Sequence, residues 1–209
     1  MSVEHPCTIA AFDVGGTKMA GALVRYSAAD AAPTVDALRS VPTEAQRGGS
    51  AVLDTLASLV ADVVADAEDD VVGIGVGTAG LVDVRTGGIA FANELMPGWT
   101  GQPVAERLSA SLGLPVAVLN DVKAHALGEA RWGAARGAQT CFVIAAGTGL
   151  GGGIVANGRV LLGAHGFAGE LGRTPCPDAL GTPRACGTAS ELESIAAGSG
   201  IEARYVAAG

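Results

Sequence analysis

The hydrophobic pattern of the first part of the chain predicts several strands and one amphipathic helix. Apolar runs at 8–13 and 19–24 are separated by "VGGTK", which predicts two strands joined by a glycine turn, and 34–43 continues the same meander. The continuous apolar run at 71–77 is typical of a strand buried on both faces. Between about 50 and 67 a helix is predicted, because apolar side chains recur at helical spacing: Val52, Leu53, Leu56, Leu59, Val60, Val63 and Val64.

The rest of the chain repeats this alternation of strands and helices. Irregular chain is expected through residue 101, followed by a helix, a strand and a helix at about 102–112, 115–120 and 122–135. Strands are predicted at 140–147, 152–158 and 159–163, and one last helix from about 189 almost to the C-terminus. Both halves open with a hairpin whose turn contains Gly-Thr. The pattern therefore predicts an α/β chain of two similar lobes, 1–121 and 122–209, the second of them incomplete.

Composition and charge narrow the possible partners. Hydrophobic residues make up 49% of the chain, and the 32 glycines must serve turns and close backbone approaches. The net charge of −8 argues against a nucleic-acid or anionic-membrane surface, but backbone N–H groups can still bind phosphates locally. The uncharged stretch 137–158 is long enough to cross a bilayer, yet seven of its residues are glycine, so paired strands are predicted instead.

The termini and cysteines favour a cytoplasmic protein. The four cysteines suggest no compact disulfide framework. The N-terminal residues lack the basic start and apolar run of a signal peptide.

Glycine-rich turns are the main candidates for chemistry. "GVGTAG" and "GTGLGG" fit G-x-G-x-x-G, but no helix is predicted after either, so the context argues against a dinucleotide-binding fold. Either "DVGGTK" or "GTGLGGG" alone reads as an ordinary tight turn, whereas their matching places in the two halves favour phosphate binding. Asp13 can hold Mg²⁺ through water. The candidate phosphate-binding residues are Asp13, Gly15, Gly16, Thr17, Lys18, Gly147, Thr148 and Gly149.

Asn120 and Asp121 lie where a strand ends and a helix begins, the edge at which α/β sheets bind ligands. Asp121 is a candidate general base toward a substrate hydroxyl, with Asn120 orienting that substrate. The competing interpretation is a routine helix N-cap. His125 and His165 have no spaced partner and are interpreted as structural.

A set of motifs in order along nearly the whole chain resembles the ROK family of sugar kinases: "DVGGTK", "GTAGLVD", "PGWTGQPV", "LPVAVLNDVKAHALGEARWGAARG", "GTGLGGGIVANGRVLLGAHGFAGELG" and "CGTASELESIAAGSGI". The resemblance implies an actin-like, RNase H-like ATPase fold of two lobes that takes ATP, Mg²⁺ and a sugar, in a cytoplasmic homodimer. It implies that Asp121 deprotonates the sugar hydroxyl. The implied sugar contacts are Gly80, Asn93, Asn120, Asp121, Glu170 and Glu193. Repressors of the family carry an N-terminal DNA-binding domain, for which no room is expected before residue 13.

Two departures from the family pattern stand out. The family's four structural zinc positions correspond to Arg173, Arg184, Cys186 and Glu191, so no structural zinc is expected, even with Cys176 nearby. Arg173 is expected either to donate to the sugar or to form an ion pair with Glu191 or Glu193. The family chain also continues beyond the last helix with the adenosine pocket, so a protein that is complete at 209 residues is expected to bind ATP weakly or not at all.

The resulting hypothesis is ATP-dependent phosphorylation of a hexose 6-hydroxyl. Glucose is favoured because "ANELMPGW" resembles the glucokinase type. "GTAG" is compatible with N-acetylmannosamine kinases, although the Arg that those enzymes can carry after it is Leu81 here. The alternatives are an N-acetylmannosamine or N-acetylglucosamine kinase, a non-catalytic sugar-binding relative, and a fragment of a normal kinase.

Overall fold

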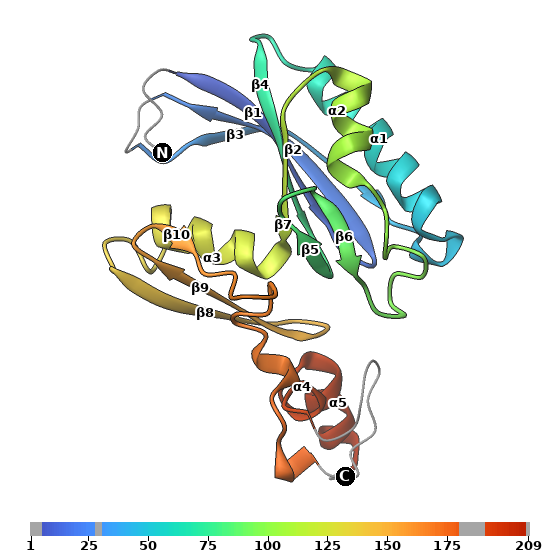
Figure 1. Ribbon diagram of the computed structural model, residues 1–209, viewed down its shortest axis with the longest axis vertical. Helices are drawn as coiled ribbons and strands as arrows, with labels where there is room; N and C mark the ends of the chain where they lie inside the picture. The colour runs from blue at the N-terminus through green and yellow to red at the C-terminus, as the bar shows by residue number, and fades with distance from the viewer. Residues whose placement is uncertain (1–5, 28–30, 180–190, 208–209) are drawn as a thin grey trace. The chain divides into compact units, whose positions relative to one another are not determined.

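The computed structural model describes residues 6–27, 31–179 and 191–207 (Figure 1). The chain divides into two compact units, residues 1–121 and 122–209. No helix among the described residues is both long and apolar enough to span a membrane.

The first unit is built on a five-stranded sheet with the strand order β3-β2-β1-β4-β7. Strands β1, β2 and β3 form the predicted antiparallel meander, and β4 and β7 extend it in parallel with β1. The strands are β1 (Cys7–Val14), β2 (Lys18–Tyr26), β3 (Thr34–Pro42), β4 (Val71–Thr78) and β7 (Val116–Asn120).

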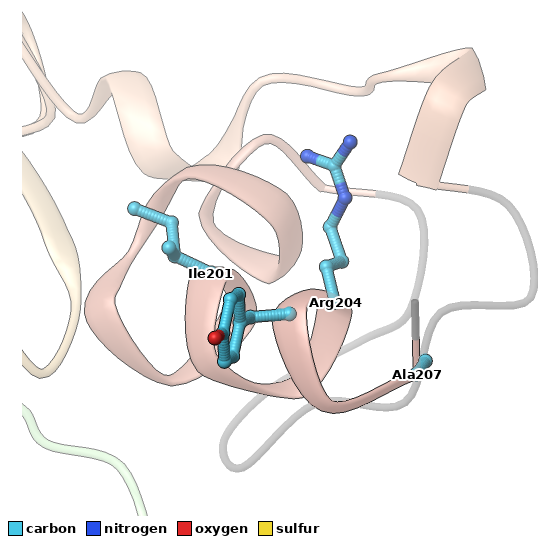
Figure 2. A pocket seen from close by; sticks show the side chains of 4 residues that line it. Ile201, Arg204 and Ala207 are labelled. Atoms are coloured by element: carbon cyan, nitrogen blue, oxygen red, sulfur yellow. The ribbon is translucent and has the colours of Figure 1, made fainter. Parts of the chain in front are cut away.

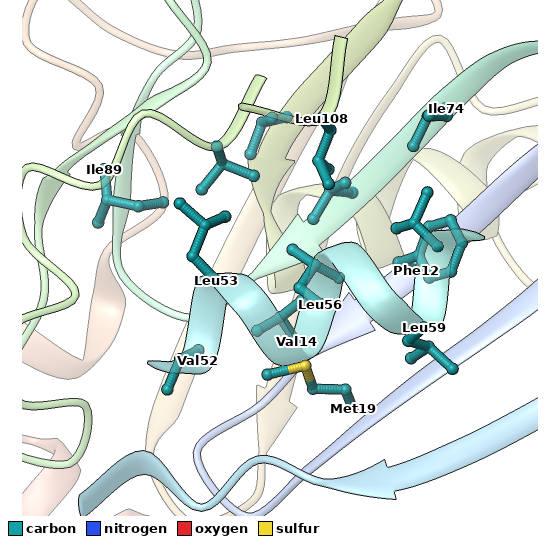
Figure 3. Close-up of a cluster of buried hydrophobic side chains, with 14 of the residues drawn as sticks. Phe12, Val14, Met19, Val52, Leu53, Leu56, Leu59, Ile74, Ile89 and Leu108 are labelled. Carbon is teal, nitrogen blue, oxygen red and sulfur yellow. The ribbon is translucent and has the colours of Figure 1, made fainter. Parts of the chain in front are cut away.

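Helices α1 (Gly49–Ala65) and α2 (Val104–Leu112) cover one face of this sheet (Figure 1). The helical spacing predicted for α1 is confirmed, because six of its seven apolar positions are buried in the core and Val64 packs at its margin (Figure 3). Strand β4 is not buried on both faces as predicted. Ile74 and Val76 face the helices, whereas Val72 is 51% exposed, since no helix among the described residues of this unit covers the other face.

A short hairpin occupies part of the segment predicted to be irregular. Strands β5 (Leu81–Asp83) and β6 (Gly88–Phe91) pair antiparallel. With three and four residues they are too short to show a period in the sequence. The hairpin returns the chain to β4, because Leu81 pairs with Phe91 and the backbone of Ala92 lies against Gly80.

The second unit contains a three-stranded antiparallel sheet with the order β10-β9-β8. Its strands are β8 (Thr140–Ala146), β9 (Leu150–Ala156) and β10 (Arg159–Val160), the last shorter than predicted. Asn157 and Gly158 join β9 to β10 with positive φ at both residues, as Asn-Gly hairpin turns require. Helix α3 (Asp121–Trp132) packs on this sheet, with Lys123 and Ala126 against Gly153. Short 3₁₀ turns follow at η2 (Leu171–Arg173) and η3 (Pro177–Ala179).

The prediction of one continuous last helix is wrong. The described part of this segment forms α4 (Glu193–Ala196) and α5 (Gly198–Ala207), separated at Ala197 by an extended backbone (φ −78°, ψ 162°). Glycine at 198 and 200 lowers helix propensity, and the N–H of Gly198 donates to Gly147 O at 2.8 Å. Figure 2 shows a shallow pocket on α5, lined by Ile201, Arg204, Tyr205 and Ala207, that contains no predicted site residue.

Replacing Leu56 in α1 tests this core assignment. Leu56 is fully buried, so Leu56→Ala should lower the free energy of unfolding by about 2–5 kcal/mol through lost burial and the cavity left behind. Chemical denaturation followed by circular dichroism measures this. The matched control is Leu38→Ala on β3, which is 73% exposed and should change stability by about 0.5 kcal/mol or less. Equal losses in the two variants would contradict the assignment.

Candidate active site

The predicted residues of the first unit converge on the carboxyl edge of three parallel strands. Val14 of β1 pairs with Thr78 of β4, and Thr78 pairs with Asn120 of β7. These three paired residues form a row across the sheet. The glycine turn at 15–18 begins directly after Val14, Gly80 lies two residues after Thr78, and Asp121 follows Asn120. Ligands of open α/β sheets bind at this edge.

The first glycine turn is fixed by Thr43, a residue that sequence analysis missed. Gly15 donates its N–H to Lys18 O (3.1 Å) within the turn. The Thr43 hydroxyl donates to Gly15 O (2.6 Å), and its backbone N–H donates to Thr17 O (3.0 Å). Thr43 is only 1% exposed, whereas residues 16–18 are exposed. Two carbonyls of the turn are thus bound on the protein side, while its tip faces outward.

Asp13 lies at the end of β1, beside this turn. Partial desolvation at the strand end raises the pKa of Asp13, and the positive charge of Lys18 opposes that shift. A cation bound nearby would favour the charged carboxylate still further. Carboxylate oxygen is the ligand type that Mg²⁺ prefers, so the residue present fits that ion.

Gly80, Asn120 and Asp121 lie close together, and Asn93 follows a residue that packs on Gly80. The side-chain amide of Asn120 donates to Gly80 O (3.1 Å) and to Asp121 Oδ1 (2.9 Å). Gly80 has φ +97°, and a Cβ there would lie 2.6 Å from Phe91 O, so only glycine fits. Asn93 follows Ala92, which packs on Gly80, and its Oδ1 accepts the N–H of Leu95 (3.1 Å).

Trp99 attaches the loop that carries Asn93 to the end of β4. Its side chain is fully buried, and Nε1 donates to Thr78 Oγ1 at 3.1 Å. Further backbone bonds, from Met96 N–H to Asn93 O and from Trp99 N–H to Met96 O, hold the loop in between. The sequence signal was only a tryptophan in a Pro-Gly-rich segment, which does not reveal the partner.

The second glycine turn joins β8 to β9 and is held by the segment around α4. The Glu193 carboxylate accepts the N–H of Leu150 through Oε2 (2.9 Å), and Gly198 N–H donates to Gly147 O. A Cβ at Gly149 would lie 2.7 Å from the same Glu193 oxygen, so the carboxylate lies directly on the turn. Glu193 as a sugar contact stays a prediction. The structure adds that it anchors the turn predicted to bind phosphate.

Two ion pairs organise the remaining candidate residues of the second unit. Lys123 Nζ lies 2.7 Å from Glu170 Oε1. Arg173 Nη1 lies 3.2 Å from Glu191 Oε2, so one of the two ion pairs predicted for Arg173 is formed. The same segments are joined by a bridge between Pro175 and Glu191 and by Leu192 N–H donating to Thr174 O.

Of the four family zinc positions, Arg184 and Cys186 lie outside the described residues. Within 6–27, 31–179 and 191–207, no three His, Cys, Asp or Glu side chains are grouped so as to hold a metal.

Comparison with known proteins decides the family. The sequence profile described as "ROK family" matches residues 9–209, nearly the whole chain. The chain belongs to the ROK family. Members of this family with solved structures share the actin-like ATPase fold, and the α/β architecture of the chain is of this kind.

Three ROK relatives illustrate the similarity. A glucokinase of Halalkalibacterium halodurans is 37% identical over 192 residues, which cover 90% of the chain and 56% of that protein. An N-acetylmannosamine kinase of Shigella boydii is 35% identical over 198 residues, 94% of the chain and 63% of that protein. The crystal structure of a ROK glucokinase from Streptomyces griseus, in complex with glucose and AMPPNP, has 31% identity and a TM-score of 0.77, covering 93% of the chain and 58% of that structure. The chain therefore spans little more than half the length of these ROK proteins.

Removing the Thr43 hydroxyl should loosen the first glycine turn. Thr43→Val leaves the partly buried Gly15 carbonyl without its hydroxyl donor, which should lower the free energy of unfolding by about 1–3 kcal/mol. Thr43→Ser keeps the hydroxyl and should lose less. Denaturant melts of both variants measure the difference. If Thr43→Val had the same free energy of unfolding as the wild-type protein, the hydroxyl would not fix the turn.

The zinc content of the purified protein tests the expectation that residues 173–191 hold no structural zinc. We expect purified protein to hold far less than one zinc per chain, because Cys186 is the one family ligand that remains among the four positions. Elemental analysis by mass spectrometry measures the ratio, and about one zinc per chain would contradict the expectation.

Proposed function

We propose that this ROK chain belongs to an ATP-dependent hexose kinase. The enzyme phosphorylates the 6-hydroxyl of its sugar, and glucose is the preferred sugar. The observation that carries the proposal is the hydrogen-bonded set of Asp121, Asn120 and Gly80 at the carboxyl edge of the sheet. It unites a carboxylate base with two residues implied in sugar binding.

In the proposed reaction Asp121 is the general base. It takes the proton of the 6-hydroxyl while that oxygen attacks the γ-phosphorus of ATP, and the bond to the β–γ bridging oxygen breaks to release ADP. The Asn120 amide, which donates to Asp121 Oδ1, orients the carboxylate. Asn93, Glu170 and Glu193 are proposed to hold the other sugar hydroxyls.

The two glycine turns are proposed to bind the ATP phosphates. In the first turn, Gly16 and Thr17 offer backbone N–H groups and Lys18 a positive charge, while Gly15 supports the turn. In the second turn, Thr148 and Gly149 have the same role, with Gly147 anchored to Gly198. Mg²⁺ near Asp13 would neutralise phosphate charge when bound.

The second candidate is an N-acetylmannosamine kinase. The relative with that name is nearly as similar as the glucokinase, with 35% against 37% identity. Leu81 in place of an Arg after Gly80 favours glucose. The homodimer expected from the family resemblance stays a prediction, as does the cytoplasmic location expected from the cysteines and the N-terminus.

Replacing the proposed base is the direct test. Asp121→Asn preserves shape but cannot accept the proton, so kcat should fall by about 10²–10⁴-fold while sugar affinity changes little. A coupled ADP-release assay on glucose, N-acetylmannosamine, N-acetylglucosamine and fructose measures turnover, and calorimetry measures sugar binding. The matched control is Asp54→Asn on the exposed side of α1, which should leave turnover unchanged.

Near wild-type turnover in Asp121→Asn would contradict the assignment of the base. A wild-type protein that binds sugar but turns over none of the four would instead support the non-catalytic alternative.

A further inference from the structure

Lys123 is the most deeply buried charged side chain in the described part of the chain. The residue is 1% exposed and lies on α3, two positions after Asp121. Its backbone packs against Gly153 of β9, which directs the side chain into the second unit. Lysine is almost never fully buried unless its charge is paired, so a specific partner is required.

The partner is Glu170, one of the residues implied in sugar binding. Lys123 Nζ donates to Glu170 Oε1 at 2.7 Å, a short charge-assisted hydrogen bond. The Glu170 side chain itself is 31% exposed, so the pair has one buried member and one that reaches the surface of its unit.

The backbone around Glu170 is fixed as well. Its N–H donates to Phe167 O (3.1 Å). Its carbonyl accepts the N–H of Arg173, the last residue of η2, at 3.2 Å. With the backbone held and one carboxylate oxygen bound to Lys123, few side-chain rotamers remain. A pre-oriented carboxylate loses little conformational entropy when it accepts hydrogen bonds from a ligand.

We propose that Lys123 is a positioning residue for sugar recognition, whose ammonium aims the Glu170 carboxylate at the hydroxyls of the hexose. The proposal rests on the proposed function, because it takes Glu170 to be a sugar contact. It adds that sugar affinity depends on a buried residue that does not touch the sugar.

If the Lys123–Glu170 ion pair served stability alone, Lys123→Met would lower the melting temperature and leave sugar affinity unchanged. Replacing both members of a buried ion pair by apolar side chains is often neutral or stabilising, and replacing one member costs little only on the condition that the other charge is not left buried and unpaired. Glu170 reaches solvent, so Lys123→Met meets this condition. Stability and sugar binding should therefore respond in different directions.

The test measures sugar affinity and stability in the same full-length variants. Lys123→Met should weaken binding of D-glucose, or of N-acetyl-D-mannosamine if that is the sugar phosphorylated, by about tenfold in calorimetry, as expected when a hydrogen bond to a charged group is weakened. Its melting temperature should be unchanged or higher. Lys123→Arg, which keeps a cationic donor, should retain more affinity than the Met variant.

A double-mutant cycle separates action through Glu170 from a general effect. Glu170→Gln should weaken sugar binding, and adding Lys123→Met to it should weaken binding little further. The charge-matched control is Arg39→Met, which removes a surface ion pair with Asp66 and should leave sugar affinity unchanged.

Three outcomes would overturn the proposal. Wild-type sugar affinity in Lys123→Met would show that the pair has no role in recognition. Additive losses in the double variant would show that Lys123 does not act through Glu170. Failure of the wild-type protein to bind any hexose would remove the proposed function itself, and this inference with it.

Discussion

The parallel register of β1, β4 and β7 is the constraint on which the candidate site depends. It aligns Val14, Thr78 and Asn120 in one row, and the first glycine turn, Gly80 and Asp121 all begin within two residues of it. A slip of one residue in β7 would turn Asn120 to the opposite face of the sheet and break its bond to Gly80. The buried bond from Trp99 to Thr78 attaches the Asn93 loop to the same row. Because α1 buries one face of the sheet, the register of its strands is strongly specified.

The sequence predicted those parts of the fold whose signals are local. The helical spacing of α1 and the β1–β2–β3 meander were recognisable because each is a continuous pattern. The β5–β6 hairpin was missed because its strands are too short to show a period, and the break at Ala197 was missed because it depends partly on a bond between Gly198 and Gly147. Asp121 and Asn120 were found from their place between a strand and a helix. Thr43 and Lys123 were not found, since their significance lies in partners 28 and 47 positions away.

Carboxylates in the second unit are bound by the protein's own polar groups. Glu193 accepts a backbone N–H of the glycine turn, Glu170 pairs with Lys123, and Glu191 pairs with Arg173. By the family resemblance, Arg173 and Glu191 are expected to correspond to two of the zinc-ligand positions. Their ion pair joins the segments around residues 173 and 191, although screening by salt weakens an exposed pair of this kind. Of the carboxylates implied in sugar binding, Glu193 is held by the second glycine turn and Glu170 by Lys123.

The proposed activity of this ROK chain is the transfer of phosphate from ATP to the 6-hydroxyl of a hexose. The most direct measurement is ³¹P and ¹H NMR of the product formed when the protein is incubated with ATP, Mg²⁺ and glucose. We expect glucose 6-phosphate and an equal amount of ADP. Phosphate on another hydroxyl, or ATP hydrolysed to inorganic phosphate without a sugar phosphate, would contradict it.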